Sequence, residues 1–247
     1  DEETCREAAE RGNFEVLRWA IENGCPIGND PSICNGVAKK GDLELLKWLR
    51  EVKGCPFDDE IVDAAASSGN LEMIRWIKEN GYPWQPFYAY TLATQGGHLE
   101  MMKYLYQNGT PLDRVSVSFQ ALTHDRFEIL KWVGELEGEI NWPSNMLAYA
   151  ARTRIEVLEW LRERGCPWDV QACDWAASSG KFEVLKWLKE NGCPLTSDTC
   201  LEAARKGRLD LLKWLKKNGC PLDPMVITYA TQRKDDDIVS WAKENEC

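Results

Sequence analysis

Cysteine has the widest range of chemistry among the residues of this 247-residue sequence, which contains ten of them. Grouped cysteines can hold zinc or form disulfides, and their spacing helps to separate these uses from a structural one. No Cys-x2-Cys pair occurs. The cysteines that could approach each other for metal or redox chemistry form three pairs: Cys25 with Cys34, Cys166 with Cys173, and Cys193 with Cys200.

Other candidate catalytic groups are few. His98 and His124 are the only histidines, and neither has a serine or cysteine at a recognisable nucleophile spacing. No phosphate-binding loop, catalytic carboxylate pair or zinc-hydrolase motif is present. Five Cys-Pro dipeptides are similar to a thiolate haem contact, but their recurrence favours a role in turn geometry. We expect no enzyme activity and no cofactor, with a ligand, haem or metal carrier that uses cysteines and aromatics as the alternative.

An aromatic residue recurs along the whole chain at intervals of 27 to 29 residues. The nine positions are Trp19, Trp48, Trp76, Tyr104, Trp132, Trp160, Trp187, Trp214 and Trp241. A fixed period of about 20 to 50 residues indicates stacked repeats. The sequence therefore predicts a single array over 1–247, with units at roughly 1–27, 28–57, 58–84, 85–112, 113–142, 143–168, 169–195, 196–222 and 223–247.

Residues 197–222 show what one unit encodes. Cys200 and a following pair of alanines have helical spacing, and Gly207 stands where a left-handed residue ends a helix. A second stretch, from Leu209 to about Asn218, has leucines and a tryptophan on one face and lysines on the other. The sequence predicts two helices and a short turn in each unit.

The repeat assigns most reactive side chains to structural columns. An acidic residue stands four positions before each aromatic residue, where a negative charge complements the dipole of a helix start. One cysteine column holds Val62, Tyr90, Met146 and Ile227 in other units, which indicates a core position. Equivalent residues of adjacent units should lie on the order of 10 Å apart, too far to share a zinc ion with ligands at about 2.3 Å. We expect free thiols and hence a reducing intracellular compartment, the cytoplasm, with the nucleus or a host cell as alternatives.

Most of the twelve tryptophans also read as core residues. Eight belong to the aromatic column, and Trp84 and Trp168 follow a turn proline, where other units have apolar residues. Trp142 and Trp175 fit neither pattern. We interpret these two as candidate contact residues.

The repeated pattern resembles the core of an ankyrin repeat, and residues 176–186 (AASSGKFEVLK) match it almost letter for letter. The period is shorter than the usual value of about 33 residues. A tryptophan replaces the usual leucine, and the residues that form the projecting β-hairpin finger are missing. This short form is similar to the tryptophan-bearing ankyrin arrays of protists and large DNA viruses. The resemblance implies an all-α, ankyrin-like helix-turn-helix repeat solenoid with fingers reduced or absent.

For function, the resemblance implies a scaffold or adaptor that binds another protein through the concave face of its first helices. A net charge of −10 disfavours nucleic acid, and no segment reaches the apolar length of a membrane span. We expect a protein partner and a monomeric chain. Because the sequence starts inside a repeat, we also expect it to be a piece of a longer protein.

In ankyrin arrays, the two residues between the alanine pair and the glycine face the concave side. Seven of these residues are basic here and one is acidic. The bias has two explanations, the preference of cations for helix C-termini and a basic groove for an acidic segment of the partner. Units four to six depart most from the pattern, through function or through neutral drift. The candidate partner-binding residues are Lys39, Lys40, Tyr88, His124, Trp142, Arg152, Trp175, Arg205 and Lys206.

Overall fold

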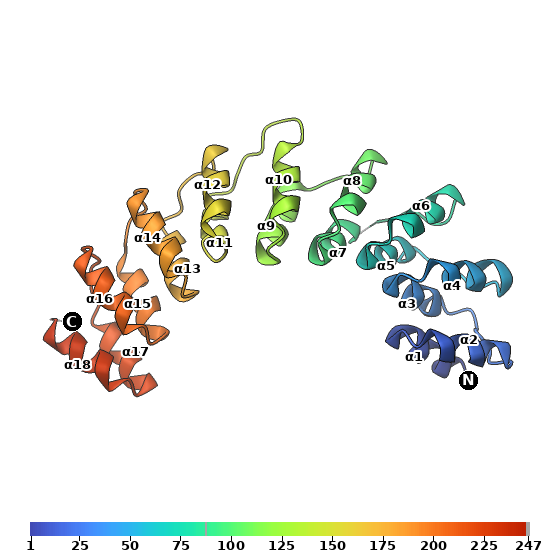
Figure 1. The fold of residues 1–247 in the computed structure, drawn as a ribbon, viewed down its shortest axis with the longest axis horizontal. Helices are drawn as coiled ribbons and strands as arrows, with labels where there is room; N and C mark the ends of the chain where they lie inside the picture. Colours follow the sequence, from blue (N-terminus) through green and yellow to red (C-terminus); the bar gives the residue numbers. More distant parts are fainter. Residues whose placement is uncertain (87, 246–247) are drawn as a thin grey trace. The chain divides into compact units, whose positions relative to one another are not determined.

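Helices joined by turns and loops make up the chain in a computed structural model that describes residues 1–86 and 88–245 (Figure 1). It divides into two compact parts, residues 1–136 and residues 137–247, here called the N-terminal part and the C-terminal part. The N-terminal part contains α1 (Glu2–Arg11), α2 (Phe14–Glu22), α3 (Ser32–Lys40), α4 (Leu43–Lys47), the π-helical turn η1 (Trp48–Val52), α5 (Ile61–Ser68), α6 (Leu71–Glu79), α7 (Ala89–Gly96), α8 (Leu99–Gln107), α9 (Arg114–Thr123) and α10 (Phe127–Glu135). The C-terminal part contains α11 (Met146–Ala150), α12 (Ile155–Glu163), α13 (Ala172–Ser178), α14 (Phe182–Glu190), α15 (Ser197–Arg205), α16 (Leu209–Lys217), α17 (Met225–Arg233) and α18 (Asp236–Glu244).

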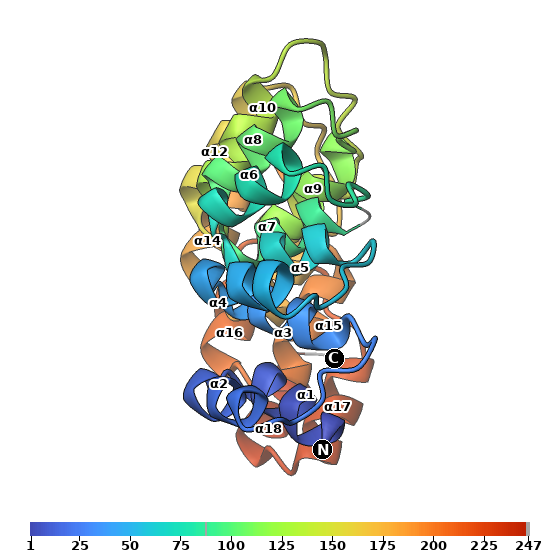
Figure 2. The ribbon, with the colours of Figure 1, turned by 90° about the vertical axis from the view of Figure 1, so that its right-hand side faces the viewer.

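Each predicted unit holds one pair of these helices, which confirms the predicted helix-turn-helix repeat over the described residues. In the N-terminal part, the first helices α1, α3, α5, α7 and α9 pack in one row beside the second helices (Figure 2). In the C-terminal part, α11, α13, α15 and α17 form the corresponding row. No strand occurs within residues 1–86 and 88–245, so turns take the place of β-hairpin fingers there.

Most first helices end at a glycine because the backbone there turns through the left-handed region. Gly41, for example, caps α3 with a φ of 88°. Asp125 and Lys234 adopt this conformation in two units without the glycine, with φ of 53° and 58°. Thr153 does not, since a β-branched residue avoids the left-handed region. Unit six therefore has a first helix of only five residues, which ends at Ala150.

Units two and five have one residue more than the other units between the aromatic residue and the turn glycine, which is Gly54 in unit two and Gly138 in unit five. In unit two the second helix takes up the extra residue in the π-helical turn η1, a single widened turn at the end of an α-helix. After η1, the turn forms the same hydrogen bond as in the units without the extra residue. The Cys55 N–H donates to the carbonyl of Leu49, just as the Cys193 N–H donates to that of Leu188 in a unit of normal length.

The two cysteine columns face each other within a unit. The pairs are Cys5 with Cys25, Cys34 with Cys55, Cys173 with Cys193, and Cys200 with Cys220. The pairs suggested by proximity in the sequence join different units, and they are wrong because each turn folds back onto the first helix of its own unit. All nine described cysteines are free thiols, and Cys247 lies outside the described residues.

The aromatic column lies between units, and each of the following aromatic residues is covered by the unit before it. Trp76 packs on Phe57 and Trp132 on Tyr106 in the N-terminal part, and Trp160 packs on Trp142 and Trp187 on Trp168 in the C-terminal part. Trp160 is 8% exposed, which confirms its predicted place in the core, whereas Trp187 is half-buried. The same prediction is wrong for Trp19. Its side chain is 66% exposed because no preceding unit covers it within the described chain.

The acidic column lies in the first turn of the second helices, where the sequence predicts it. Its ion pairs with a Lys or Arg three residues on are Glu44–Lys47, Glu72–Arg75, Glu100–Lys103, Glu128–Lys131 and Glu183–Lys186. The carboxylates are exposed, so that these pairs add little to stability.

Polar residues thirteen positions before the aromatic column bridge consecutive units. Asn35 Nδ2 donates to Asp58 Oδ1 at 3.0 Å, and the backbone N–H of Tyr88 donates to both carboxylate oxygens of Asp63. Asp174 Oδ1 accepts hydrogen bonds from the hydroxyls of the next unit's threonines, Thr196 and Thr199. In each case the partner lies at the start of the next unit's first helix, so these bonds hold that helix to its neighbour.

Asp63 and Asp174 are costly bridging groups because they are only 7% and 9% exposed. Burial raises the pKa of Asp174, and the hydrogen bonds from Thr199 and Thr196 oppose that rise. Burial also raises the pKa of Asp63 in the N-terminal part. In the folded state burial therefore disfavours the charged form of both carboxylates.

The exposure of the aromatic column predicts two different mutational costs. Trp160→Ala should lower the free energy of unfolding by about 3–5 kcal/mol, the cost of deleting a large buried aromatic side chain. Trp19→Ala should stay within about 0.5 kcal/mol, since the ring is largely solvated. Urea unfolding followed by circular dichroism measures both. Equal costs for the two variants would contradict the inter-unit packing described above.

The raised pKa of Asp174 predicts a pH-dependent effect of Asp174→Asn. A folded pKa above the unfolded value of about 3.9 means that the native state binds protons more readily, so the stability contributed by this group is lost as the pH rises through the folded pKa. Asparagine does not titrate there. The melting temperature of Asp174→Asn relative to wild type should therefore be higher at pH 7.5 than at pH 4.5. A difference that is the same at both pH values would show that the carboxylate does not titrate in this window.

Candidate functional site

A groove lies over first helices in each part of the chain. The groove of the N-terminal part has a volume of about 1000 Å³ and lies over α1, α3, α5 and the start of α7. Lys39 and Lys40 lie on it at the end of α3, and Tyr88, 67% exposed, lies on it at the start of α7. Its other charged residues are carboxylates: Glu10, Asp30, Asp58, Asp59, Glu60 and Asp63.

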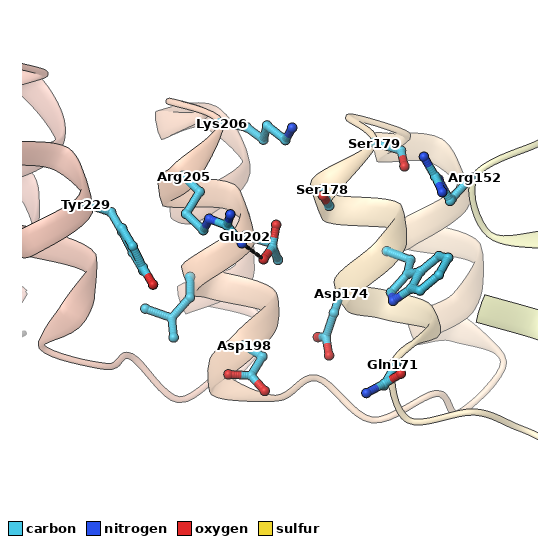
Figure 3. Close-up of a pocket in the computed structure, with 12 residues that line it drawn as sticks. Arg152, Gln171, Asp174, Ser178, Ser179, Asp198, Glu202, Arg205, Lys206 and Tyr229 are labelled. Atoms are coloured by element: carbon cyan, nitrogen blue, oxygen red, sulfur yellow. Dashed lines mark hydrogen bonds and ion pairs between the residues drawn. The ribbon is translucent and has the colours of Figure 1, made fainter. Parts of the chain in front are cut away.

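The groove of the C-terminal part is smaller, about 570 Å³, and lies over α13, α15 and α17 (Figure 3). Arg152 and Lys206 lie at one edge and Asp174 and Asp198 at the other. Arg205 lies between the two edges and forms an ion pair of 2.6 Å with Glu202. This groove therefore balances three cations against three carboxylates.

Two aromatic rings lie on the C-terminal groove. Trp175 packs on Tyr149 with 4.8 Å between ring centroids, and the guanidinium of Arg152 lies over the Trp175 ring at 5.3 Å. The guanidinium of Arg205 lies 5.8 Å from the centroid of Tyr229. Both cations therefore rest on the face of a ring, where the ring's quadrupole attracts them.

Helix polarity explains why each groove has two kinds of edge. The first helices run in the same direction within a part, so their N-termini form one edge and their C-termini the other. The helix dipole favours carboxylates in the first turn of a helix and cations in the last turn. Asp198 at the start of α15 and Lys206 at its end follow this preference. Dipole complementarity thus accounts for the separation of charge across each groove.

The structure assigns seven of the nine sequence-predicted residues to the two grooves. Lys39, Lys40 and Tyr88 lie on the N-terminal groove, and Arg152, Trp175, Arg205 and Lys206 lie on the C-terminal groove. His124 is exposed at the end of α9 and lines neither groove.

Trp142 requires a correction. The sequence interpretation makes it a contact residue, but its side chain is 7% exposed and packs against Trp160 with 6.2 Å between ring centroids. Its ring covers Trp160 of unit six, as the ring of Phe57 covers Trp76 of unit three, although no proline precedes Trp142 in the sequence. A side chain so buried offers a partner too little surface, so Trp142 belongs to the core.

The sequence analysis missed Tyr229 and Glu202 as groove residues, together with the column that contains them. Trp175, Glu202 and Tyr229 all stand twelve residues before the aromatic column of their units. The corresponding residues of the N-terminal groove are Gly36, Ala64 and Leu92. Smaller side chains in this column leave more room, which explains the larger volume of the N-terminal groove. Counting back from the aromatic residue would have identified this column.

The described residues contain no group of three or more His, Cys, Asp or Glu side chains that could hold a metal ion. None of the helices in residues 1–86 and 88–245 combines the length and the apolar character needed to cross a membrane.

Comparison with known proteins identifies the fold. No protein-family model and no curated protein matches this sequence. Among solved structures, the chain is similar to the crystal structure of the human ASB11 ankyrin repeat domain, with a TM-score of 0.57 and 23% sequence identity. The similarity covers 77% of this chain and 98% of that domain. The predicted resemblance is confirmed at the level of fold: the chain is built as an ankyrin-repeat solenoid.

Proposed function

We propose that this chain is a non-catalytic protein-binding module that holds an acidic segment of another protein in the C-terminal groove. The observation that carries this proposal is the group of three cations, Arg152, Arg205 and Lys206, that lines one groove with the rings of Trp175 and Tyr229. Arginine, tryptophan and tyrosine are the residue types that dominate binding energy at protein interfaces.

The three cations differ in how free they are to meet a partner. Lys206 is exposed and has no ion pair within the described chain, so its charge is open to a carboxylate. Arg152 is exposed and held in place over Trp175, which reduces the entropy that it loses on binding. Arg205 already pairs with Glu202, and a partner carboxylate would compete for it or share it. The segment should therefore place its acidic residues at Arg152 and Lys206.

The N-terminal groove fits an acidic segment less well. Lys39 and Lys40 are its only cations, against six carboxylates among its lining residues. The exposed ring of Tyr88 is available to a partner there, but the local charge opposes an acidic one. The proposal of a basic site is accordingly restricted to the C-terminal groove.

We also infer that the protein works as a monomer inside the cell, in the cytoplasm. The nine free thiols of the described residues support a reducing compartment. A protein-binding role is further supported by the fold that the chain shares with an ankyrin repeat domain, although a shared fold by itself does not establish a function.

A selection from a library of displayed twelve-residue peptides, with the whole chain as bait, tests the proposal. The enriched peptides should be rich in Asp and Glu, and the double variant Arg152→Glu/Lys206→Glu should bind them at least about tenfold more weakly, equivalent to about 1.4 kcal/mol. Opposite charges steer the encounter, so the association rate should fall as well, and wild-type binding should weaken with added salt.

The matched control is Lys213→Glu/Lys217→Glu, which makes the same change of net charge at exposed positions of the second helix α16. It should bind the selected peptides as wild type does, and circular dichroism should show both variants folded. Enrichment of peptides without acidic residues, or equal losses in the two variants, would refute the assignment to this groove.

A further inference from the structure

The helix starts in the N-terminal groove form an acidic edge. Five of the six carboxylates that line this groove lie before or at the start of α3 and α5: Asp30, Asp58, Asp59, Glu60 and Asp63. The two cations of the groove, Lys39 and Lys40, lie at the other edge, where α3 ends. The lining residues along the edge of helix starts therefore carry negative charge only.

The chemistry of a helix start explains only part of this charge. Asp58 is a structural residue of the repeat, because its Oδ1 accepts a hydrogen bond from the N–H of Glu60, and the equivalent aspartates of three other units make the same bond. Asp59 stands in a position that is uncharged in units five to nine, which have Val115, Pro143, Val170, Ser197 and Pro224 there. A helix start in this repeat does not require the charge of Asp59.

Two carboxylates of the edge are free to bind a cation. Asp59 and Glu60 are exposed, and neither side chain forms an ion pair or a hydrogen bond within the described chain. Their position next to Asp63 is unfavourable in the free protein. Burial raises the pKa of Asp63, and the negative charge of Glu60 raises it further. A cation bound at this edge would relieve that repulsion.

The ring of Tyr88 lies beside these carboxylates. The backbone N–H of Tyr88 donates to Asp63 at 3.0 Å, which holds the start of α7 against the acidic edge. The side chain of Tyr88 is 67% exposed, and it lines the same groove as Asp59 and Glu60. The face of an aromatic ring attracts a cation, so this ring and the two free carboxylates favour the same kind of group.

An unsatisfied acceptor of the groove favours a cation that carries N–H donors. The Asn35 amide nitrogen donates to Asp58, which leaves Asn35 Oδ1 as an acceptor. This oxygen is buried and has no hydrogen-bond partner within the described residues, an arrangement that costs free energy. A guanidinium combines a positive charge, five N–H donors and a flat face that stacks on rings. Arginine therefore fits these groups better than lysine.

The spacing of these groups indicates an extended occupant. No group of three or more acidic, His or Cys side chains in residues 1–86 and 88–245 could hold a metal ion, so these carboxylates are too far apart to share one. They recur from unit to unit, and packed helices lie about 8–10 Å apart. Three residues of an extended chain span about 10 Å. A segment with a cation at every third residue therefore places one cation at each unit.

We propose that the acidic edge, from Asp30 to Tyr88, binds an extended basic segment of another protein. One arginine of the segment binds Asp59 and Glu60 and stacks on the ring of Tyr88. The next cation binds at Asp30, where it competes with Arg6 at 3.8 Å. The C-terminal groove takes no part in this binding, so this site and the site for an acidic segment can be tested separately. The contact should be weak at physiological salt, because exposed charges are screened.

Fluorescence anisotropy with a labelled peptide, in which Ser-Gly-Arg occurs four times, tests this site on the whole chain at about 20 mM salt. The double variant Asp59→Asn/Glu60→Gln should bind the peptide at least about fivefold more weakly than wild type, since two exposed ion pairs are lost. Tyr88→Ala should bind it about two- to fivefold more weakly, and Tyr88→Phe, which keeps the ring face, should bind it as wild type does.

The matched control is Glu51→Gln/Glu79→Gln, which makes the same change of net charge at exposed positions of η1 and α6 outside the groove. This control should bind the peptide as wild type does, and Arg152→Glu/Lys206→Glu should bind it at least as tightly. Circular dichroism checks that each variant is folded.

Three results would overturn the proposal. Equal losses in the two neutralised variants would mean that the peptide responds only to the net charge of the chain. Wild-type binding by Tyr88→Ala would remove the ring from the site. Displacement of the peptide by an equal concentration of spermine would show that the edge takes any small polycation and is not a site for a protein segment.

Discussion

Contact between consecutive units is the constraint on which the rest of this structure depends. One helix pair has too little apolar surface to enclose a core, so each unit completes its core against its neighbours. The aromatic column shows this directly, because the ring of one unit is covered by side chains of the unit before it, as Trp168 covers Trp187. Polar side chains add hydrogen bonds to the same contact between consecutive units. Asp63 and Asp174 each reach forward to the start of the next first helix, where they satisfy a backbone N–H or threonine hydroxyls.

This stacking also determines what the binding surface can be. Because the first helices run side by side in the same direction within a part, each groove must have one edge of helix starts and one of helix ends. The separation of cations from carboxylates between the edges is therefore largely set by helix chemistry and occurs in both grooves, although the N-terminal groove has more carboxylates. A second difference between the grooves lies in the column between the edges, where Gly36 and Ala64 line the N-terminal groove and Trp175 and Tyr229 line the C-terminal one. Specificity for a partner is more readily varied in this column than at the edges.

The sequence predicted those features that repeat and missed those that depend on which neighbour a side chain meets. The period alone was enough for the helix pairs, and the spacing of apolar residues placed their core faces. Seven of nine candidate contact residues lie on a groove, and the five basic ones do so because their position relative to the helix end is the same in every unit. The exposure of Trp19, the burial of Trp142 and the pairing of Cys5 with Cys25 could not be predicted in this way. Each depends on which neighbouring side chain a turn or a ring packs against. The spacing of residues along the sequence does not show that contact.

The π-helical turn in unit two shows how this kind of chain can change length during evolution. An insertion in a strand would reverse the side of every residue after it, and an insertion in a tightly packed α-helix would rotate the rest of the helix by about 100°. Here a single widened turn takes up the extra residue, and Cys55 still reaches Leu49 at the end of the helix. Genetic insertions of one codon can thus persist without a compensating change in the neighbouring units.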